Sequence, residues 1–429
     1  MSDVAAICIV FVVLMVIGVP IYAVVGFSVA VALHYADIPQ TMLAQTAFTA
    51  LQPFPLLSIP LFVLAGRLME KGGMANHLIK IATSLVGAYK GSLGLVTVIA
   101  CAFFAALNGS GPATTAAVGS VTIPTMLKEG YSRRYAGAVA ASAGALGSLI
   151  PPSNLMVIYA LVAEVSIPRM FFAGIIPGIF VTALLLLTAW FIAKRKGYGG
   201  HGEPFAWRPL LHALWAGKWA VGAPLVILGG IYTGVFTPTE AAGVAVAYAL
   251  FVGLFVYKEL NAAAILEALR FTALIAGLLV LITPTTAFGQ VLALYNLPER
   301  TIELLGPVVQ NKWLFLLVVG IFLILIGTFM ESLAQIILFT PVLLPAAMKA
   351  GIDPITFGIF TVLTCEIGFL TPPVGGNLFI GARLAKASVE QISVAVIPFC
   401  LAYIFGMAFV VALPQVVVWL PNLVFGVGR

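Results

Sequence analysis

Charged side chains are scarce in this sequence. Asp, Glu, Lys and Arg make up 8% of the 429 residues, whereas hydrophobic residues make up 62%. A soluble globule of this length needs many more polar side chains to cover its surface, so the composition excludes one. The sequence therefore predicts a polytopic membrane protein with the lipid bilayer as its surroundings.

The basic excess does not indicate nucleic-acid binding. The formal net charge is +6, but the Lys and Arg residues lie singly or in short clusters between apolar stretches. Basic residues in such connections orient helices by the positive-inside rule. We therefore expect no nucleic-acid partner.

Residue patterns typical of enzymes are also missing. The four histidines, at positions 34, 77, 201 and 212, form no H-E-x-x-H motif, and the sequence has no G-x-S-x-G motif. It also lacks the Walker A pattern of ATP-driven pumps. The four cysteines include no C-x-x-C pair. We expect neither enzymatic activity nor a bound cofactor.

What the sequence has is a series of long apolar stretches, and a helix needs roughly 20 apolar residues to cross a bilayer. The first stretch, 4–33, is expected to form one helix. Regions 92–128 and 313–349 are each interrupted by a small or polar cluster, "NGSGPATT" and "GTFMESLAQ". Each half is short for a span, so we expect two re-entrant helical hairpins with tips at membrane depth. Two thin spanning helices with a buried turn are the alternative.

Two other apolar stretches contain a proline pair: "GSLIPPSN" within 135–165 and "LTPPVGGN" within 354–385. Proline lacks a backbone donor and disfavours helix at the preceding residue, so nearby carbonyls lose their intrahelical partners. Inside a membrane such carbonyls must face protein, water or an ion. Oxygen ligands of this kind suit Na⁺, and the half-helix N-termini that follow suit an anionic substrate. A simple packing kink is the alternative for each break.

An internal repeat relates the two halves of the chain. When the sequence is aligned with itself so that Pro124 meets Pro345, further matches appear at the same offset, and most of them are Gly or Pro. The matched pairs are Pro124 with Pro345, Lys128 with Lys349, Gly130 with Gly351, Gly137 with Gly358, Gly147 with Gly368, Pro151 with Pro372, Pro152 with Pro373 and Pro177 with Pro398. Apolar composition alone does not produce eight such matches, so the sequence predicts a duplication.

The repeat defines the expected domain organisation. Residues 1–218 form a first repeat, with hairpin 92–128, broken helix 135–165 and a cytoplasmic connector. Residues 219–238 form a linking helix, and 239–429 a second repeat with hairpin 313–349 and broken helix 354–385. Most basic residues fall on one membrane side if the two copies enter the membrane from opposite sides. We therefore expect an all-α fold with an inverted structural repeat, an architecture typical of ion-coupled secondary transporters.

Several motifs give the chain a resemblance to a known family. They are "LLSIPLFVLAGRLMEKGG" (56–73), "NGSGPATTAAVGSVTIPTM" (108–126), "GSLIPPSNLMVIYA" (147–160), "GTFMESLAQIILFTPVLLP" (327–345) and "LTPPVGGNLFIGA" (370–382). In these motifs and their order, the chain resembles the large membrane subunit of tripartite ATP-independent periplasmic (TRAP) transporters.

This resemblance implies a function and partners. It implies sodium-coupled uptake of an organic acid, such as a sialic acid or a C4-dicarboxylate, across the bacterial inner membrane by an elevator movement. A soluble periplasmic binding protein would deliver the substrate. A small four-helix membrane subunit is expected as a separate chain, and Na⁺ as the only metal. A stand-alone ion-coupled carboxylate carrier without a binding protein is the alternative.

The resemblance also implies two sodium sites and a substrate region. The first sodium site would comprise Asn108, Gly109, Ser110, Pro151, Pro152, Ser153 and Asn154. The second would comprise Thr328, Glu331, Ser332, Thr371, Pro372, Gly375 and Asn377. The substrate region would include Ser110, Thr114, Asn154, Ser332 and Asn377.

The two acidic residues expected at membrane depth are Glu331 and Glu366. Ionisable groups there are costly, which makes them functional candidates. For Glu331, where many members of the family have Asp, we favour a role in cation binding or in stabilising the tip over a helix N-cap. For Glu366 the sequence leaves a functional and a charge-neutralising role equally open.

Overall fold

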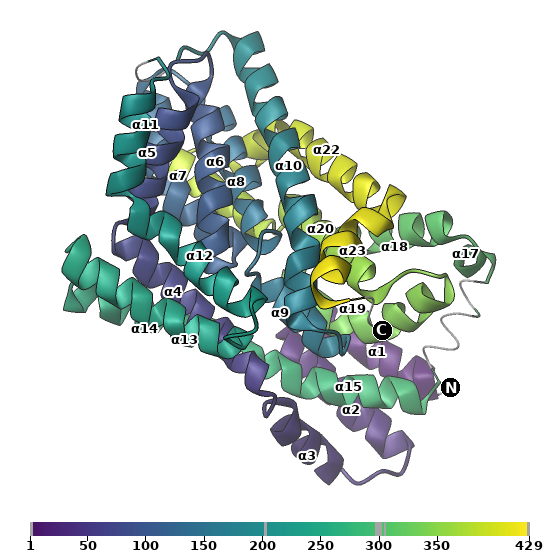
Figure 1. Ribbon diagram of the computed structural model, residues 1–429. Helices are drawn as coiled ribbons and strands as arrows, with labels where there is room; N and C mark the ends of the chain where they lie inside the picture. The colour runs from purple at the N-terminus through teal and green to yellow at the C-terminus, as the bar shows by residue number, and fades with distance from the viewer. Residues whose placement is uncertain (1–2, 201–203, 297–302, 304–305, 427–429) are drawn as a thin grey trace.

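The computed structural model describes residues 3–200, 204–296, 303 and 306–426. Within these ranges the regular secondary structure is entirely helical (Figure 1). This confirms the all-helical prediction. Five of the described helices are long and apolar enough to cross a membrane, or up to seven if each bent helix pair is counted as one span.

The helices follow one another closely along the chain. Their bounds are α1 Asp3–Val16, α2 Ile21–Tyr35, α3 Thr41–Ala50, η1 Phe54–Leu57, α4 Ser58–Lys71, α5 Met74–Val86, α6 Ser92–Asn108, α7 Gly111–Lys128, α8 Arg133–Gly144, η2 Ala145–Ser148, α9 Asn154–Val162, α10 Ile167–Lys196, α11 Trp207–Ala216, α12 Lys218–Tyr232, α13 Pro238–Phe251, η3 Val252–Val256, α14 Ala262–Leu278, η4 Leu279–Leu281, α15 Ile282–Leu294, α17 Pro307–Gln310, α18 Lys312–Gly327, α19 Ser332–Lys349, α20 Pro354–Phe369, α21 Gly376–Ala385, α22 Val389–Ala412 and α23 Pro414–Phe425.

The first apolar stretch differs from the expectation. Residues 4–33 do not form one helix but two, α1 and α2, which pack against each other. The chain turns between them at Gly18, which has a φ of 80°, and α2 starts directly after Pro20. Glycine tolerates this backbone conformation and proline cannot continue the preceding helix. The expectation was wrong because it counted apolar residues and gave these two residues no weight.

The repeat is visible in the element bounds themselves. Adding 221 to the bounds of α7, 111–128, gives 332–349, which are the bounds of α19. The same offset moves Arg133, where α8 starts, to Pro354, where α20 starts. It also brings Ser132 to Asp353, and both side chains accept backbone N–H groups as the N-caps of these helices.

The offset also pairs helices near the ends of the two halves. Residues 3–16 of α1 correspond to 224–237, which overlap α12, so α12 occupies the place of α1 in the second half. Residues 41–71, from α3 to α4, correspond to 262–292 of α14 and α15. The domain boundaries expected from the sequence, with 219–238 as a linking helix, stay a prediction.

The two halves interlock through their broken helices. Gly137 of α8 packs against the backbone of Gly381 in α21, and Gly358 of α20 packs against the ring of Tyr159 in α9. The Tyr159 hydroxyl donates to the Pro354 carbonyl over 2.6 Å. Helix α8, which precedes the first break, therefore lies beside α21, which follows the second break. Likewise α20, which precedes the second break, lies beside α9, which follows the first. This antiparallel arrangement is what an inverted repeat requires.

A second group of helices lies along one side of the broken helices. In this group α4 packs along α13 and α14, and α15 packs against α2 and α3 (Figure 1). At the end of α4, the Lys71 amine lies 2.8 Å from the Glu267 carboxylate of α14. The Arg67 guanidinium lies 3.7 Å from the centre of the Phe271 ring. These contacts fix α14 over the broken helices, where its side chains reach the candidate site.

Candidate functional site

The first hairpin tip lies directly against the first helix break. The Asn154 backbone N–H donates to the Gly109 carbonyl over 3.1 Å. Gly109 has a φ of 62°, and a Cβ there would meet the Pro152 carbonyl. Only glycine combines this conformation with this approach at no steric cost. The structure thus brings together the tip and break residues predicted for the first sodium site.

Asn108 organises the first tip from inside. Its side-chain oxygen accepts from the Ser110 N–H over 2.9 Å and from the Thr114 hydroxyl over 3.0 Å. At the break, the Ser153 hydroxyl donates to the Ser148 carbonyl and caps α9 by accepting from Met156 N–H. The hydroxyl of Thr114, which is predicted for the substrate region, therefore donates its hydrogen bond within the tip.

The second tip meets the second break in the same manner. The Val374 N–H donates to the Thr328 carbonyl over 2.8 Å, a tip-to-break bond like that between Asn154 and Gly109. The Glu331 carboxylate accepts from Leu333 N–H over 2.8 Å and from Ala334 N–H over 3.2 Å, which caps α19. The helix N-cap, the less favoured alternative for Glu331, is therefore present, and it holds the tip.

The two breaks differ in exposure. Pro151 and Pro152 are buried, whereas Pro372 and Pro373 are exposed, as is Val374 beside them. Both proline–proline bonds are cis. Gly375 has a φ of 34° and is the N-cap residue of α21, and the Thr371 hydroxyl donates to the Ile367 carbonyl. The first break is therefore enclosed by protein and the second is open.

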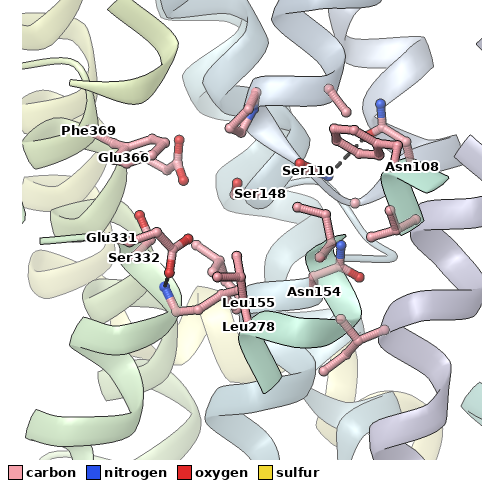
Figure 2. Close-up of a pocket in the computed structure, with 18 residues that line it drawn as sticks. Asn108, Ser110, Ser148, Asn154, Leu155, Leu278, Glu331, Ser332, Glu366 and Phe369 are labelled. Carbon is pink, nitrogen blue, oxygen red and sulfur yellow. Dashed lines mark hydrogen bonds between the residues drawn. The ribbon is translucent and has the colours of Figure 1, made fainter. Parts of the chain in front are cut away.

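Both tips line one cavity of about 110 Å³. Figure 2 shows Asn108, Ser110, Ser148 and Asn154 of the first half across from Glu331, Ser332 and Glu366 of the second. Phe271, Ile275 and Leu278 of α14, with Ile59 and Val63 of α4, close it with apolar side chains. The two hairpins belong to different halves of the chain, and they meet at this shared space.

Glu366 connects the two halves. It is 1% exposed, and its carboxylate accepts from the Asn377 side-chain amide over 3.2 Å. A Cβ at Gly111, where α7 starts, would lie 3.2 Å from an oxygen of the same carboxylate, and the Gly111 N–H donates to the Ser148 hydroxyl over 3.2 Å. One buried carboxylate therefore joins the second broken helix to the start of α7 in the first half of the chain.

Asn377 lies close to both halves of the chain. It follows the second break, as its place in the second predicted site implies, and a Cβ at Gly111, where α7 starts, would lie 3.0 Å from its amide nitrogen. Ser148 is not among the predicted site residues, although it shortly precedes the first break; Glu366, which lines the same cavity, lies in the other half of the chain.

Several buried oxygens at or beside the cavity lack a partner among the described residues. They are Asn154 Oδ1, Ser332 Oγ and Asn377 Oδ1, on side chains at most 7% exposed. Nearly all buried polar atoms in proteins are hydrogen-bonded, so such atoms mark places where a ligand or water completes the structure. The three oxygens come from the predicted sodium-site and substrate residues.

Comparison with known proteins places this architecture in a family. The family described as "Tripartite ATP-independent periplasmic transporter, DctM component" matches residues 8–416. The isethionate TRAP transporter permease protein DctMQ of Oleidesulfovibrio alaskensis is 39% identical over 94% of this chain, which spans 65% of that relative's length. The C4-dicarboxylate TRAP transporter large permease protein DctM of Rhodobacter capsulatus is 37% identical over 96% of this chain and 97% of the relative.

A solved structure shares the fold. The YdaH transporter of Alcanivorax borkumensis, described as having an unusual topology, superposes with a TM-score of 0.61. The match covers 90% of this chain and 89% of that one at 18% sequence identity. At this identity the likeness shows a common fold alone.

Proposed function

Because this chain belongs to the DctM component family of tripartite ATP-independent periplasmic transporters, we propose that it couples Na⁺ entry to the uptake of an organic acid. The family is one of transporter permeases and not of enzymes. The chain is a multi-pass protein of the bacterial inner membrane. The coupling ion, the substrate class and the mechanism are the proposed parts.

The unpartnered oxygens at the cavity support Na⁺ as the coupling ion. Hard cations prefer oxygen ligands, and non-helical backbone at membrane depth supplies carbonyls for them. Asn154 and Ser332, each with an unpartnered oxygen among the described residues, line the cavity. Asn377, which has a third such oxygen, contacts the lining carboxylate of Glu366. No cofactor is needed in this mechanism, since Na⁺ is itself transported.

The charges of the lining support a cation as well. Glu331 and Glu366 both line the cavity, and no Lys or Arg is among its described lining residues. The ion pairs of the described chain, Arg67–Glu70 and Lys71–Glu267, include neither carboxylate. Glu366 is buried, and a buried carboxylate is costly unless a cation or hydrogen-bond donors compensate it. Bound Na⁺ would compensate Glu366, and Glu331 would attract the ion to the same space.

Two helix N-termini support an anionic substrate. Helices α7 and α9 begin at residues beside the cavity, after Ser110 and Ser153, whereas the first N–H groups of α19 are taken by the Glu331 carboxylate. Each N-terminus presents a partial positive charge equivalent to about half a unit charge. In the absence of a basic side chain among the described lining residues, these termini and the bound cations would attract a carboxylate or sulfonate.

The proposal names a class of organic acid and not a single compound. One relative is named for isethionate and another for C4-dicarboxylate at nearly the same identity, 39% and 37%. We propose a small organic acid such as a C4-dicarboxylate or a sialic acid, delivered by a soluble periplasmic binding protein. A separate small four-helix membrane subunit would complete the transporter.

An elevator movement is the proposed route across the membrane. The hairpins and broken helices interlock as one unit, whereas α4, α13 and α14 form a separate packed group beside it. Gly66 of α4 lets the first tip approach closely, because a Cβ there would overlap the Asn108 side chain. The unit with the cavity would slide along these outer helices, and the contact at Gly66 would break.

One observation carries this proposal. Both hairpin tips, the first break and two carboxylates line the same cavity. Its test is uptake of labelled organic acids into proteoliposomes with an inward Na⁺ gradient. We expect uptake to require Na⁺, the small subunit and the binding protein together. Sodium-driven uptake without the binding protein would favour the stand-alone carrier, and uptake without Na⁺ would refute the coupling.

A further inference from the structure

A groove on the outer face of the protein, distant in sequence from both tips, lies between α10 and α22. The two helices touch where Gly406 leaves room for Val181 and where the rings of Phe180 and Phe409 stack with centres 4.2 Å apart. Beyond this crossing they separate. The resulting space measures about 870 Å³ and runs between residues 184–196 of α10 and 398–405 of α22.

The walls of the groove are apolar along its length. Leu187, Phe191 and Phe405 line it with 61%, 59% and 64% of their surfaces exposed. From Leu184 to Arg195 the groove extends roughly 17 Å at about 1.5 Å per helical residue. One leaflet contributes about half of the roughly 30 Å hydrocarbon thickness of a bilayer. The length of the groove therefore matches the thickness of the acyl-chain layer in one leaflet.

Positive charge gathers at one end of the groove. Arg195 and Lys196, both exposed, line it in the last turn of α10. Among the described residues neither has an acidic partner, since the ion pairs found there involve other side chains. Trp190 also lines the groove, and the Lys194 amine lies 4.8 Å from the centre of its ring. Tryptophan beside basic residues is typical of the membrane–water interface.

We propose that this groove binds an anionic phospholipid, with its phosphate at Arg195 and Lys196 and its acyl chains along α10 and α22. Arginine can hold a phosphate through two parallel N–H···O bonds, and lysine adds a second positive charge. Basic pockets between membrane helices are known to bind anionic head groups. A zwitterionic lipid fits the apolar walls equally well but leaves the charge of the two side chains uncompensated.

The internal repeat shows that this charge is specific to one half. The offset that brings Pro177 to Pro398 also brings Arg195 and Lys196 to Val416 and Val417. The repeated part of the fold therefore does not need basic residues at these positions. The lipid site is an addition to the first half, on helices that do not line the transport cavity.

Quenching of Trp190 fluorescence by brominated lipids tests the proposal directly. The purified chain is reconstituted in zwitterionic bilayers with increasing fractions of brominated phosphatidylglycerol or brominated phosphatidylcholine. The chain has six tryptophans, so the Trp190 contribution is the difference between the unmodified chain and Trp190→Phe. We expect half-maximal quenching at a roughly thirtyfold lower fraction of the anionic lipid, as two basic side chains near a phosphate predict.

Variants separate the charge from the shape of the groove. Arg195→Gln/Lys196→Gln should remove the preference for the anionic lipid, while Lys90→Gln/Lys128→Gln, an exposed basic pair outside the groove, should keep it. Thr188→Phe fills the groove with both charges retained and should weaken quenching by either lipid. Equal quenching by the two lipids, or a preference that persists in the double variant, would overturn the proposal. So would loss of quenching when the small subunit is present, because a protein would then cover the groove.

Discussion

The hydrogen bond between Asn377 and Glu366 orients the side-chain amide of Asn377. The amide nitrogen of Asn377 donates to Glu366, so its oxygen points away from that carboxylate, without a partner among the described residues. Gly111, at the start of α7 in the first half, lies beside the same carboxylate. Such second contacts commonly orient the groups that bind a metal ion. Under the proposed function, Glu366 therefore acts on both candidate sodium sites.

Replacing Glu366 by Gln tests this role. The variant keeps the size of the side chain but removes its charge, and hydrogen bonds to charged groups contribute about 1.5–3 kcal/mol. We expect the Na⁺ concentration for half-maximal uptake to rise about tenfold or more. Sodium titration of uptake in proteoliposomes measures it. Glu390→Gln, which neutralises an exposed carboxylate in the first turn of α22, is the matched control and should leave the titration unchanged; equal curves for both variants would count against a role of Glu366.

Gly109 provides a test of the first tip. In Gly109→Ala the new Cβ meets the Pro152 carbonyl, and the left-handed backbone costs about 1–2 kcal/mol for a residue with a side chain. We expect a lower thermal unfolding midpoint and slower uptake. Gly229→Ala, in helix α12 with open space around it, should be neutral or slightly stabilising. An unchanged melting temperature for Gly109→Ala would show that the tip tolerates a shift.

At the scale of elements, the pattern of Gly and Pro predicted the interrupted helices well. Region 92–128 appears as α6 and α7, joined at Gly109 and Ser110, because Gly and Pro set these boundaries locally. The pattern of Gly and Pro could not predict where Asn377 and Ser148 lie in the folded protein. Their positions depend on the packing of α20 and α21 against α8 and η2, which belong to the other half of the chain. Hydrophobic patterns locate the helices but not which helices become neighbours.

The proline pairs invite a test at this scale. Pro151→Ala/Pro152→Ala, and separately Pro372→Ala/Pro373→Ala, restore backbone donors and favour continuous helix. In these variants, the carbonyls that the breaks leave free to bind a cation would accept hydrogen bonds within the helix. We expect both double variants to bind Na⁺ more weakly in uptake titrations. Pro224→Ala inside α12 removes a helix proline away from the cavity and serves as control. Wild-type titration curves in both double variants would refute a role of the breaks in Na⁺ binding.

At the scale of the whole molecule, an inverted repeat would place repeat-equivalent residues on opposite faces of the membrane. Lys128 and Lys349 end helices α7 and α19, occupy the same position of the repeat and are both exposed. The inversion therefore predicts that the two side chains contact different aqueous compartments.

Cysteine labelling checks this topology. In a background without the native cysteines, Lys128→Cys should react with an impermeant maleimide only from the cytoplasmic side, and Lys349→Cys only from the periplasmic side. Lys196→Cys, at the end of α10, serves as a cytoplasmic reference, as positive-inside orientation requires. Reaction of both positions from one side would contradict the inversion.

The unequal exposure of the two breaks has a consequence for the transport cycle. The halves share one succession of helices, yet Pro151 and Pro152 are enclosed while Pro372 and Pro373 are open. If each half adopted the backbone conformation of the other, the enclosed and open breaks would change places. Under the proposed alternating access, this exchange of conformations between the halves would give the opposite-facing state of the same chain.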